Sequence, residues 1–139
     1  MAERLELPNR REHVTTKFRI LGPQPRTVYV ALHDDHEPAE VFIRIRGADL
    51  PDETIALYDV LARMMSLALQ HGAPLARVGT MLEGVQCSPA GPAQGDARIR
   101  FCRSVPDLIG KYLTLEATSD PRNQNGGAPP EKVFRVVGG

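Results

Sequence analysis

The chain has 139 residues, enough for one domain with a modest hydrophobic core. Its 17 basic residues balance its 17 acidic residues, so the overall charge favours neither nucleic acid nor an anionic membrane. No apolar run could span a bilayer, and the charged N-terminus lacks the apolar stretch of a secretory signal, so we expect a cytoplasmic protein without a membrane partner.

Three segments with a period of two predict β-strands, because apolar and polar side chains alternate along them. The segments are residues 13–20, 26–33 and 40–46. A short polar link at 34–38 separates the second segment from the third and favours an antiparallel hairpin. Residues 1–12 are polar and are expected to form an N-terminal arm.

The hydrophobic period then changes to that of an α-helix. Asp49 and Asp52 are candidate N-caps of a long helix, and Gly72 suits its left-handed end. Pro74 begins a second, shorter helix that ends at Gly84. The expected buried stripe of the long helix consists of Ile55, Tyr58, Leu61, Ala62, Met65, Ala68 and Leu69.

The last third of the chain contains one further strand pattern and one clear helix start. Residues 97–103 alternate arginine with apolar residues and could form a fourth strand. Ser104 and Asp107 have the spacing of a capping box, which begins a third helix. Residues 118–139 are expected to be a flexible C-terminal tail, within which 133–137 either pairs as an edge strand or hangs free.

These elements predict an α+β domain over residues 13–117. We expect an antiparallel sheet of three to four strands with one long and two shorter helices packed on one face. The other face of such a sheet is uncovered, and a homodimer is the simplest way to cover it.

Basic residues lie opposite the apolar ones on the predicted strands, so cations would gather on the uncovered face. Arginine and aromatic side chains on an open sheet can hold phosphates and stack bases, which predicts binding of a nucleotide or of single-stranded nucleic acid. Alternatively, the face is only solvated, and some arginines pair with Glu40 or with aspartates. The candidate binding residues are Lys17, Arg19, Arg44, Arg46, Arg98, Arg100, Tyr29 and Phe42.

Other reactive side chains give weaker patterns. His33 and His36 flank two aspartates, which are possible metal ligands, but the segment also has the composition of an ordinary polar turn. Cys87 and Cys102 lie outside any CxxC spacing and are expected to be free thiols. No spaced pair of acidic and basic catalytic groups stands out, so we predict no catalytic residue, metal or cofactor.

Several short motifs follow one another along the chain. They are K-F-R-I-L-G at 17–22, Tyr29-Val30, P-A-E-V-F-I at 38–43, the long helix and its exit at 57–75, P-A-G at 89–91, and R-S-V-P-D at 103–107. In this order they resemble the TSCPD domain, the C-terminal domain of adenosylcobalamin-dependent (class II) ribonucleotide reductases. The resemblance covers about residues 10–115 and implies a link to deoxyribonucleotide synthesis.

The chain departs from the family pattern at the motif that names the domain. Arg103 and Val105 stand where that motif has threonine and cysteine, so a metal role for the cysteine does not carry over. The catalytic barrel, with its radical cysteine and cobalamin contacts, and the C-terminal redox cysteine pair have no counterpart here.

The resemblance therefore implies a stand-alone accessory or regulatory domain that is not catalytic alone and whose expected partner is a reductase large chain. Two alternatives come from other classes of protein. One is a nucleotide- or nucleic-acid-binding module that uses the basic face, and the other is a plain dimerisation domain.

Overall fold

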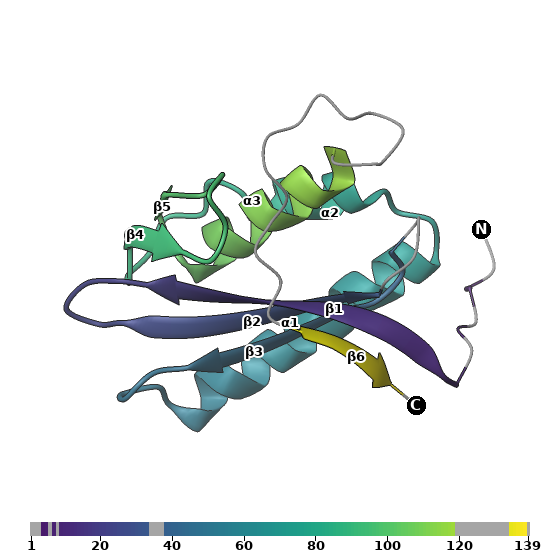
Figure 1. Cartoon of the computed structure of the whole chain (residues 1–139), viewed down its shortest axis with the longest axis horizontal. Coiled ribbons are helices and arrows are strands. Elements are labelled where there is room, and N and C mark those ends of the chain that lie inside the picture. The colour runs from purple at the N-terminus through teal and green to yellow at the C-terminus, as the bar shows by residue number, and fades with distance from the viewer. Residues whose placement is uncertain (1–3, 6, 8, 34–37, 119–133, 139) are drawn as a thin grey trace.

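A computed structural model describes residues 4, 5, 7, 9–33, 38–118 and 134–138 of the chain. Its centre is an antiparallel sheet in which the long strands β1 (Arg11–Ile20), β2 (Arg26–His33) and β3 (Val41–Arg46) lie side by side (Figure 1). The predicted hairpin between the second and third strands is confirmed, since β2 and β3 pair antiparallel from Thr27–Arg46 to Leu32–Val41.

The sheet is larger than predicted, because six strands occur among the described residues and the expectation was three to four. Along the main path the order is β3-β2-β1-β4-β5. The strand expected at 97–103 shrinks to β5 (Phe101–Cys102), and β4 (Gly91–Gln94) lies in a segment for which no strand was predicted. Pro92 lacks an N–H group and glycine weakens a strand, so the sequence of β4 gives no strand signal.

The last strand, β6 (Phe134–Gly138), pairs with Arg11–Thr15 of β1, along the half of β1 that β4 leaves uncovered. Of the two possibilities for the end of the chain, the edge strand is therefore the one that the structure shows. The rest of the predicted tail, 119–133, lies outside the described residues.

Three helices form the second layer: α1 (Asp52–Gln70), α2 (Leu75–Leu82) and α3 (Val105–Thr118). The predicted N-caps of α1 are wrong. Pro51 occupies that position in an extended conformation without a side-chain hydrogen bond, and Asp52 is already the first helical residue. Asp52 instead places its negative charge in the first turn, where it is attracted to the positive end of the helix dipole.

The helices cover one face of the sheet, as predicted. Side chains from alternate strand positions, such as Phe18, Val30 and Ile43, share one core with Met65 of α1 and Leu108 of α3. Among the described residues, no helix is both long enough and apolar enough to cross a membrane.

The predicted buried stripe of α1 is only partly confirmed. Ala62, Met65 and Leu69 are buried, and Tyr58, Leu61 and Ala68 are packed against the core, but Ile55 is 42% exposed. The side of α1 that faces away from the sheet carries exposed apolar side chains: Leu57, Val60, Met64 and Leu67.

Two glycines let α2 and α3 approach each other backbone to backbone. A Cβ atom added to Gly110 of α3 would lie 2.5 Å from the nitrogen of Glu83 and 2.6 Å from the carbonyl oxygen of Gly79. A Cβ atom on Gly79 would lie 2.6 Å from Oγ1 of Thr114. The backbones of α2 and α3 are therefore in contact at Gly79 and Gly110, and neither position has room for a side chain.

The predicted capping box at the start of α3 is confirmed in part. Ser104 Oγ accepts the N–H of Asp107 at 2.9 Å and donates to the carbonyl of Val85 at 2.6 Å. The Asp107 carboxylate accepts the N–H groups of Arg103 at 2.8 Å and Gly84 at 2.7 Å, and it pairs with Lys111. Asp107 thus reaches past Ser104 and fastens α3 to the end of α2.

Candidate functional site

The face of the sheet turned away from the helices carries most of the predicted binding residues. Strand pairing sets Lys17 of β1 beside Tyr29 of β2, and Tyr29 beside Arg44 of β3. The next row joins Arg19, Thr27 and Arg46 in the same way. Because side chains at paired positions point to the same face, these four cations and Tyr29 form one surface, which we call the basic face.

Tyr29 lies at the centre of the basic face. The Lys17 Nζ atom is 6.0 Å from the centre of the Tyr29 ring, and the Arg46 guanidinium carbon is 5.9 Å from it. The ring is half-buried, while Lys17, Arg44 and Arg46 are exposed. Cations at these distances over an aromatic ring are attracted to it, which holds the two long side chains above the sheet.

Phe42 extends the basic face toward the other end of the sheet. It pairs with Ala31 and is 48% exposed, and its ring meets the His13 ring edge to face with centroids 5.0 Å apart. The predicted aromatic residues Tyr29 and Phe42 therefore lie on the same face as the cations. They belong to neighbouring pairs on that face, since Tyr29 pairs with Arg44 and Phe42 pairs with Ala31.

The structure does not bring Arg98 to this surface. It lies in the turn before β5, where its guanidinium binds the buried Asp96 carboxylate at 2.8 Å and Glu116 of α3 at 3.5 Å. Because the carboxylates of Asp96 and Glu116 form hydrogen bonds with Arg98, its pKa is raised. Arg100 is exposed, but it precedes β5 at the far end of the sheet order, away from β2 and β3.

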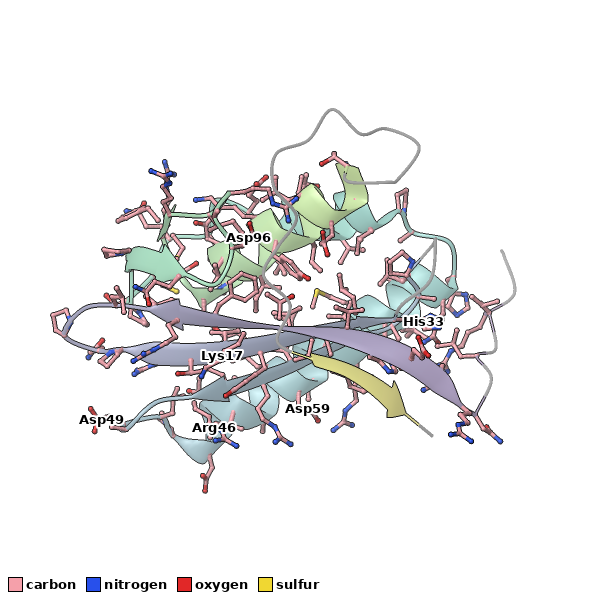
Figure 2. All side chains as sticks on the ribbon, viewed as in Figure 1. Lys17, His33, Arg46, Asp49, Asp59 and Asp96 are labelled. Atoms are coloured by element: carbon pink, nitrogen blue, oxygen red, sulfur yellow. The ribbon has the colours of Figure 1, made fainter. Side chains whose placement is uncertain are left out.

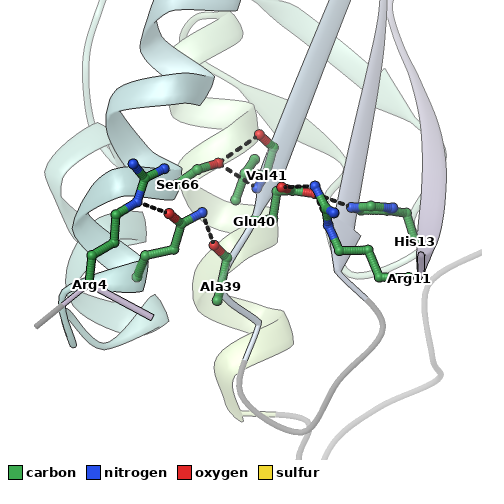
Figure 3. A network of polar contacts seen from close by, with 8 residues as sticks. Arg4, Arg11, His13, Ala39, Glu40, Val41 and Ser66 are labelled. Carbon is green, nitrogen blue, oxygen red and sulfur yellow. Dashed lines mark hydrogen bonds and ion pairs between the residues drawn. The ribbon is translucent and has the colours of Figure 1, made fainter. Parts of the chain in front are cut away.

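A buried polar cluster lies at the start of β1, where Arg11, an arginine outside the predicted binding set, pairs with Glu40. Glu40 is bound by Arg11 at 2.6 Å and by His13, as Figure 3 shows. Burial acts to raise the pKa of Glu40, but the hydrogen bonds from Arg11 and His13 outweigh it and hold the pKa below its ordinary value. Glu40 thus pairs with Arg11 and His13 of β1, and not with the arginines of β3.

Metal and thiol chemistry find little support in the described residues. They contain no group of three or more histidine, cysteine or acidic side chains placed to hold a metal ion. His33 is buried, and the aspartates and His36 that follow it lie outside the described residues. Cys87 and Cys102 are free thiols, as predicted, and burial raises the pKa of Cys102.

A groove of about 950 Å³ begins on the basic face and continues around the free edge of β3 to the first turns of α1. Sequence reasoning missed its helical wall, because the wall depends on how α1 lies against β3. That wall consists of Asp52, Ile55, Ala56 and Asp59.

Comparisons with known proteins identify the chain's relatives. The TSCPD domain model matches residues 3–117. The chain is 30% identical over 122 residues to a vitamin B12-dependent ribonucleotide reductase of Bradyrhizobium diazoefficiens, which covers 86% of this chain and 9% of the reductase. A reductase of the same name from Agrobacterium fabrum is 30% identical over 115 residues, covering 81% of this chain and 9% of that protein.

No solved structure matches the chain. The chain spans about 9% of the length of the reductases that it matches, so the similarity concerns one part of those enzymes. The described fold explains the motif that names the domain, since Ser104 and Asp107 form the buried cap of α3 and Val105 is 2% exposed in the core. The match of the TSCPD domain model to residues 3–117, together with the 30% identity to the Bradyrhizobium reductase, shows that the chain belongs to the TSCPD domain family.

Proposed function

We propose that this TSCPD domain is an accessory binding domain for a vitamin B12-dependent ribonucleotide reductase, acting in deoxyribonucleotide synthesis in the cytoplasm. The observation that carries the proposal is the family match over residues 3–117, together with two relatives that share this segment and are reductases. The domain acts by binding, and the reductase supplies the chemistry of nucleotide reduction.

The test is direct binding between the purified chain and the vitamin B12-dependent reductase polypeptide of the same organism. Isothermal titration calorimetry should give a saturable complex in the micromolar range or tighter. Copurification of that reductase with the tagged chain from the native host would agree with it. A reductase that shows no complex at about 100 µM, either as heat in calorimetry or as a faster species in sedimentation velocity, would contradict the proposal, because such a complex would be weaker than about 5.5 kcal/mol.

The basic face supports a second candidate, binding of a nucleotide or of single-stranded nucleic acid. Lys17, Arg44 and Arg46 surround Tyr29, so a phosphate chain and a stacked base could be held together. If all four cations of the face contact phosphates, the slope of log K against log salt should be about −3. Fluorescence anisotropy with a labelled oligo-dT across a salt series measures this slope.

The matched variants for this experiment differ only in where the charge is reversed. Arg44→Glu should weaken oligonucleotide binding at least about tenfold, since it replaces an attraction with a repulsion beside Tyr29. Arg77→Glu, on an exposed position of α2, should have no effect. Equal losses in the two variants, or binding that does not depend on salt, would contradict a phosphate site on the basic face.

A homodimer that covers the open sheet face stays a prediction. Sedimentation velocity measures it, and the arginines of β3 argue for a weak complex, because two copies of the basic face repel each other. A tight dimer that is indifferent to salt and to nucleotides would favour the plain dimerisation domain over both other functions.

A further inference from the structure

Strand β3 ends the sheet on one side, so half of its backbone hydrogen-bonding groups point away from β2. The N–H of His33 donates to the carbonyl of Glu40 at 3.0 Å, which shows which residues of this strand bond toward β2. In an antiparallel pair, bonding to a given neighbour alternates along the strand. Phe42, Arg44 and Arg46 therefore bond toward β2, and Val41, Ile43 and Ile45 turn their N–H and C=O groups outward.

One of these three outward positions is already filled by a side chain. Ser66 of α1 accepts the N–H of Val41 at 2.9 Å and donates to the carbonyl of Val41 at 3.1 Å, as Figure 3 shows. One hydroxyl thus takes the place that a residue of a neighbouring strand would occupy. Within the described residues, the outward groups of Ile43 and Ile45 have no such partner.

The groove runs along this open edge. One wall is the open face of β3, with Phe42, Arg44 and Arg46. The other is the start of α1, where Ile55 and Ala56 form an apolar middle between Asp52 and Asp59. Figure 1 shows α1 turning back alongside β3, and Figure 2 places Arg46 and Asp59 near the edge. Ile43 lines this groove, so its unpaired backbone groups lie between a cationic wall and a partly apolar wall, and Ile45 is the next outward position along β3.

We propose that an extended segment of a partner polypeptide adds to β3 as a further strand, hydrogen-bonded to Ile43 and Ile45. Successive side chains of such a segment point to opposite faces. Those on the open face meet Arg44 and Arg46 and should be acidic. Those on the helix side meet Ile55 and Ala56 and should be apolar. The segment that fits is an alternation of acidic and apolar residues.

A second copy of this chain fits the edge less well. Because Ser66 occupies the edge at Val41, a two-fold pairing of β3 with its own copy must use Ile43 and Ile45. The register that pairs these two residues sets Arg44 opposite Arg44 of the copy. Like charges directly opposite each other destabilise a sheet, so a partner of opposite charge is favoured. The inference needs neither the reductase nor a nucleotide.

The probe is a fluorescent peptide of alternating glutamate and valine, compared with three matched peptides. One has the same composition in scrambled order, one carries lysine in place of glutamate, and one is methylated on alternate backbone nitrogens. We expect saturable binding of the first peptide to the full chain. Methylation should weaken binding at least about tenfold, because it removes backbone donors that each contribute about 1 kcal/mol.

Isoleucine-selective nitrogen-15 labelling locates the bound peptide by NMR. The amide signals of Ile43 and Ile45 should shift and exchange more slowly with solvent, because their N–H groups gain acceptors. The signal of Ile109, which is fully buried in α3, serves as the internal control and should not move.

Two variants on the same helix test the groove itself. Ala56→Trp fills the groove at an exposed helical position and should weaken peptide binding at least about tenfold. Leu57→Trp adds a comparable side chain on the outward side of α1, at a position that is 59% exposed, and should leave binding unchanged. Circular dichroism and thermal melts show that both variants are folded.

Each outcome decides the proposal. Binding that needs the alternating order and free backbone amides, shifts Ile43 and Ile45, and is lost in Ala56→Trp supports it. Equal binding of the scrambled peptide would reduce the effect to charge attraction and overturn it. Absence of binding at about 1 mM peptide, or concentration-dependent protection of Ile43 and Ile45 in the chain alone, would also overturn it, the latter in favour of a second copy.

Discussion

Replacing Gly110 by alanine is expected to lower the free energy of unfolding by about 3 kcal/mol and the melting temperature by about 10 °C. Alanine is the better helix former by about 1 kcal/mol, so helix propensity alone predicts the opposite sign. The loss arises because the new methyl group would meet the backbone of Gly79 and the nitrogen of Glu83 within 2.6 Å. Neither atom can move without separating α2 from α3.

Urea denaturation monitored by circular dichroism measures this change. Gly79→Ala should act in the same direction, since its Cβ atom would meet Oγ1 of Thr114. Thr80→Ala, at the next and exposed position of α2, is the control and should change stability by less than about 0.5 kcal/mol. A Gly110→Ala variant that is more stable than the natural chain would disprove the close approach of the two helices.

Replacing Asp107 by asparagine is expected to cost about 3 kcal/mol, although the two side chains have nearly the same shape. The carboxylate is 1% exposed and accepts N–H groups from Arg103 and Gly84. In the variant one acceptor oxygen becomes an amide nitrogen that carries hydrogens, so one buried N–H group faces a donor. The ion pair with Lys111 is lost as well.

The contribution of Asp107 should also depend on pH. Burial acts to raise the pKa of Asp107, but the Arg103 and Gly84 amides and the Lys111 ammonium outweigh it, so the pKa lies below its ordinary value. A carboxyl group whose pKa is lowered by folding contributes its full stability above the pKa of the unfolded chain. That contribution is lost as the pH falls from about 5 through the folded pKa.

Denaturation curves at several pH values therefore compare the natural chain with Asp107→Asn. The difference in unfolding free energy should be largest near pH 7 and should shrink toward pH 3. Asp59→Asn is the control, because the exposed ion pair of Asp59 with Arg63 contributes less than about 1 kcal/mol. A difference that stays constant across this pH range would show that the charge of Asp107 does not act as described.

The strands and helices with regular hydrophobic periods could be predicted from the sequence. β3 alternates strictly between buried and exposed residues because one face packs on helices and the other meets water, so the period follows directly from burial. β4 could not be predicted, since the Gly-Pro-Ala-Gln segment has no period. It is a strand because the N–H of Leu21 donates to the carbonyl of Pro92 at 2.9 Å and β1 supplies the pairing partner.

The basic face was predictable to the extent that its residues lie on regular strands. Lys17, Arg44 and Arg46 follow the alternation, so their common face could be predicted before their pairing was known. Arg98 follows the same alternation but does not lie on a strand. Its position depends on the turn before β5, where the buried Asp96 binds its guanidinium at 2.8 Å and Glu116 of α3 lies 3.5 Å away, and the alternation pattern predicts neither contact.

The strand pairing of Arg11 with Gly138 places the start of β1 beside the end of β6 at one corner of the sheet. Partners across an antiparallel ladder are about 5 Å apart, so a chain entering at β1 leaves at β6 almost where it came in. A module with this geometry can be spliced into a longer host polypeptide, or lifted out of one, without pulling the flanking segments apart.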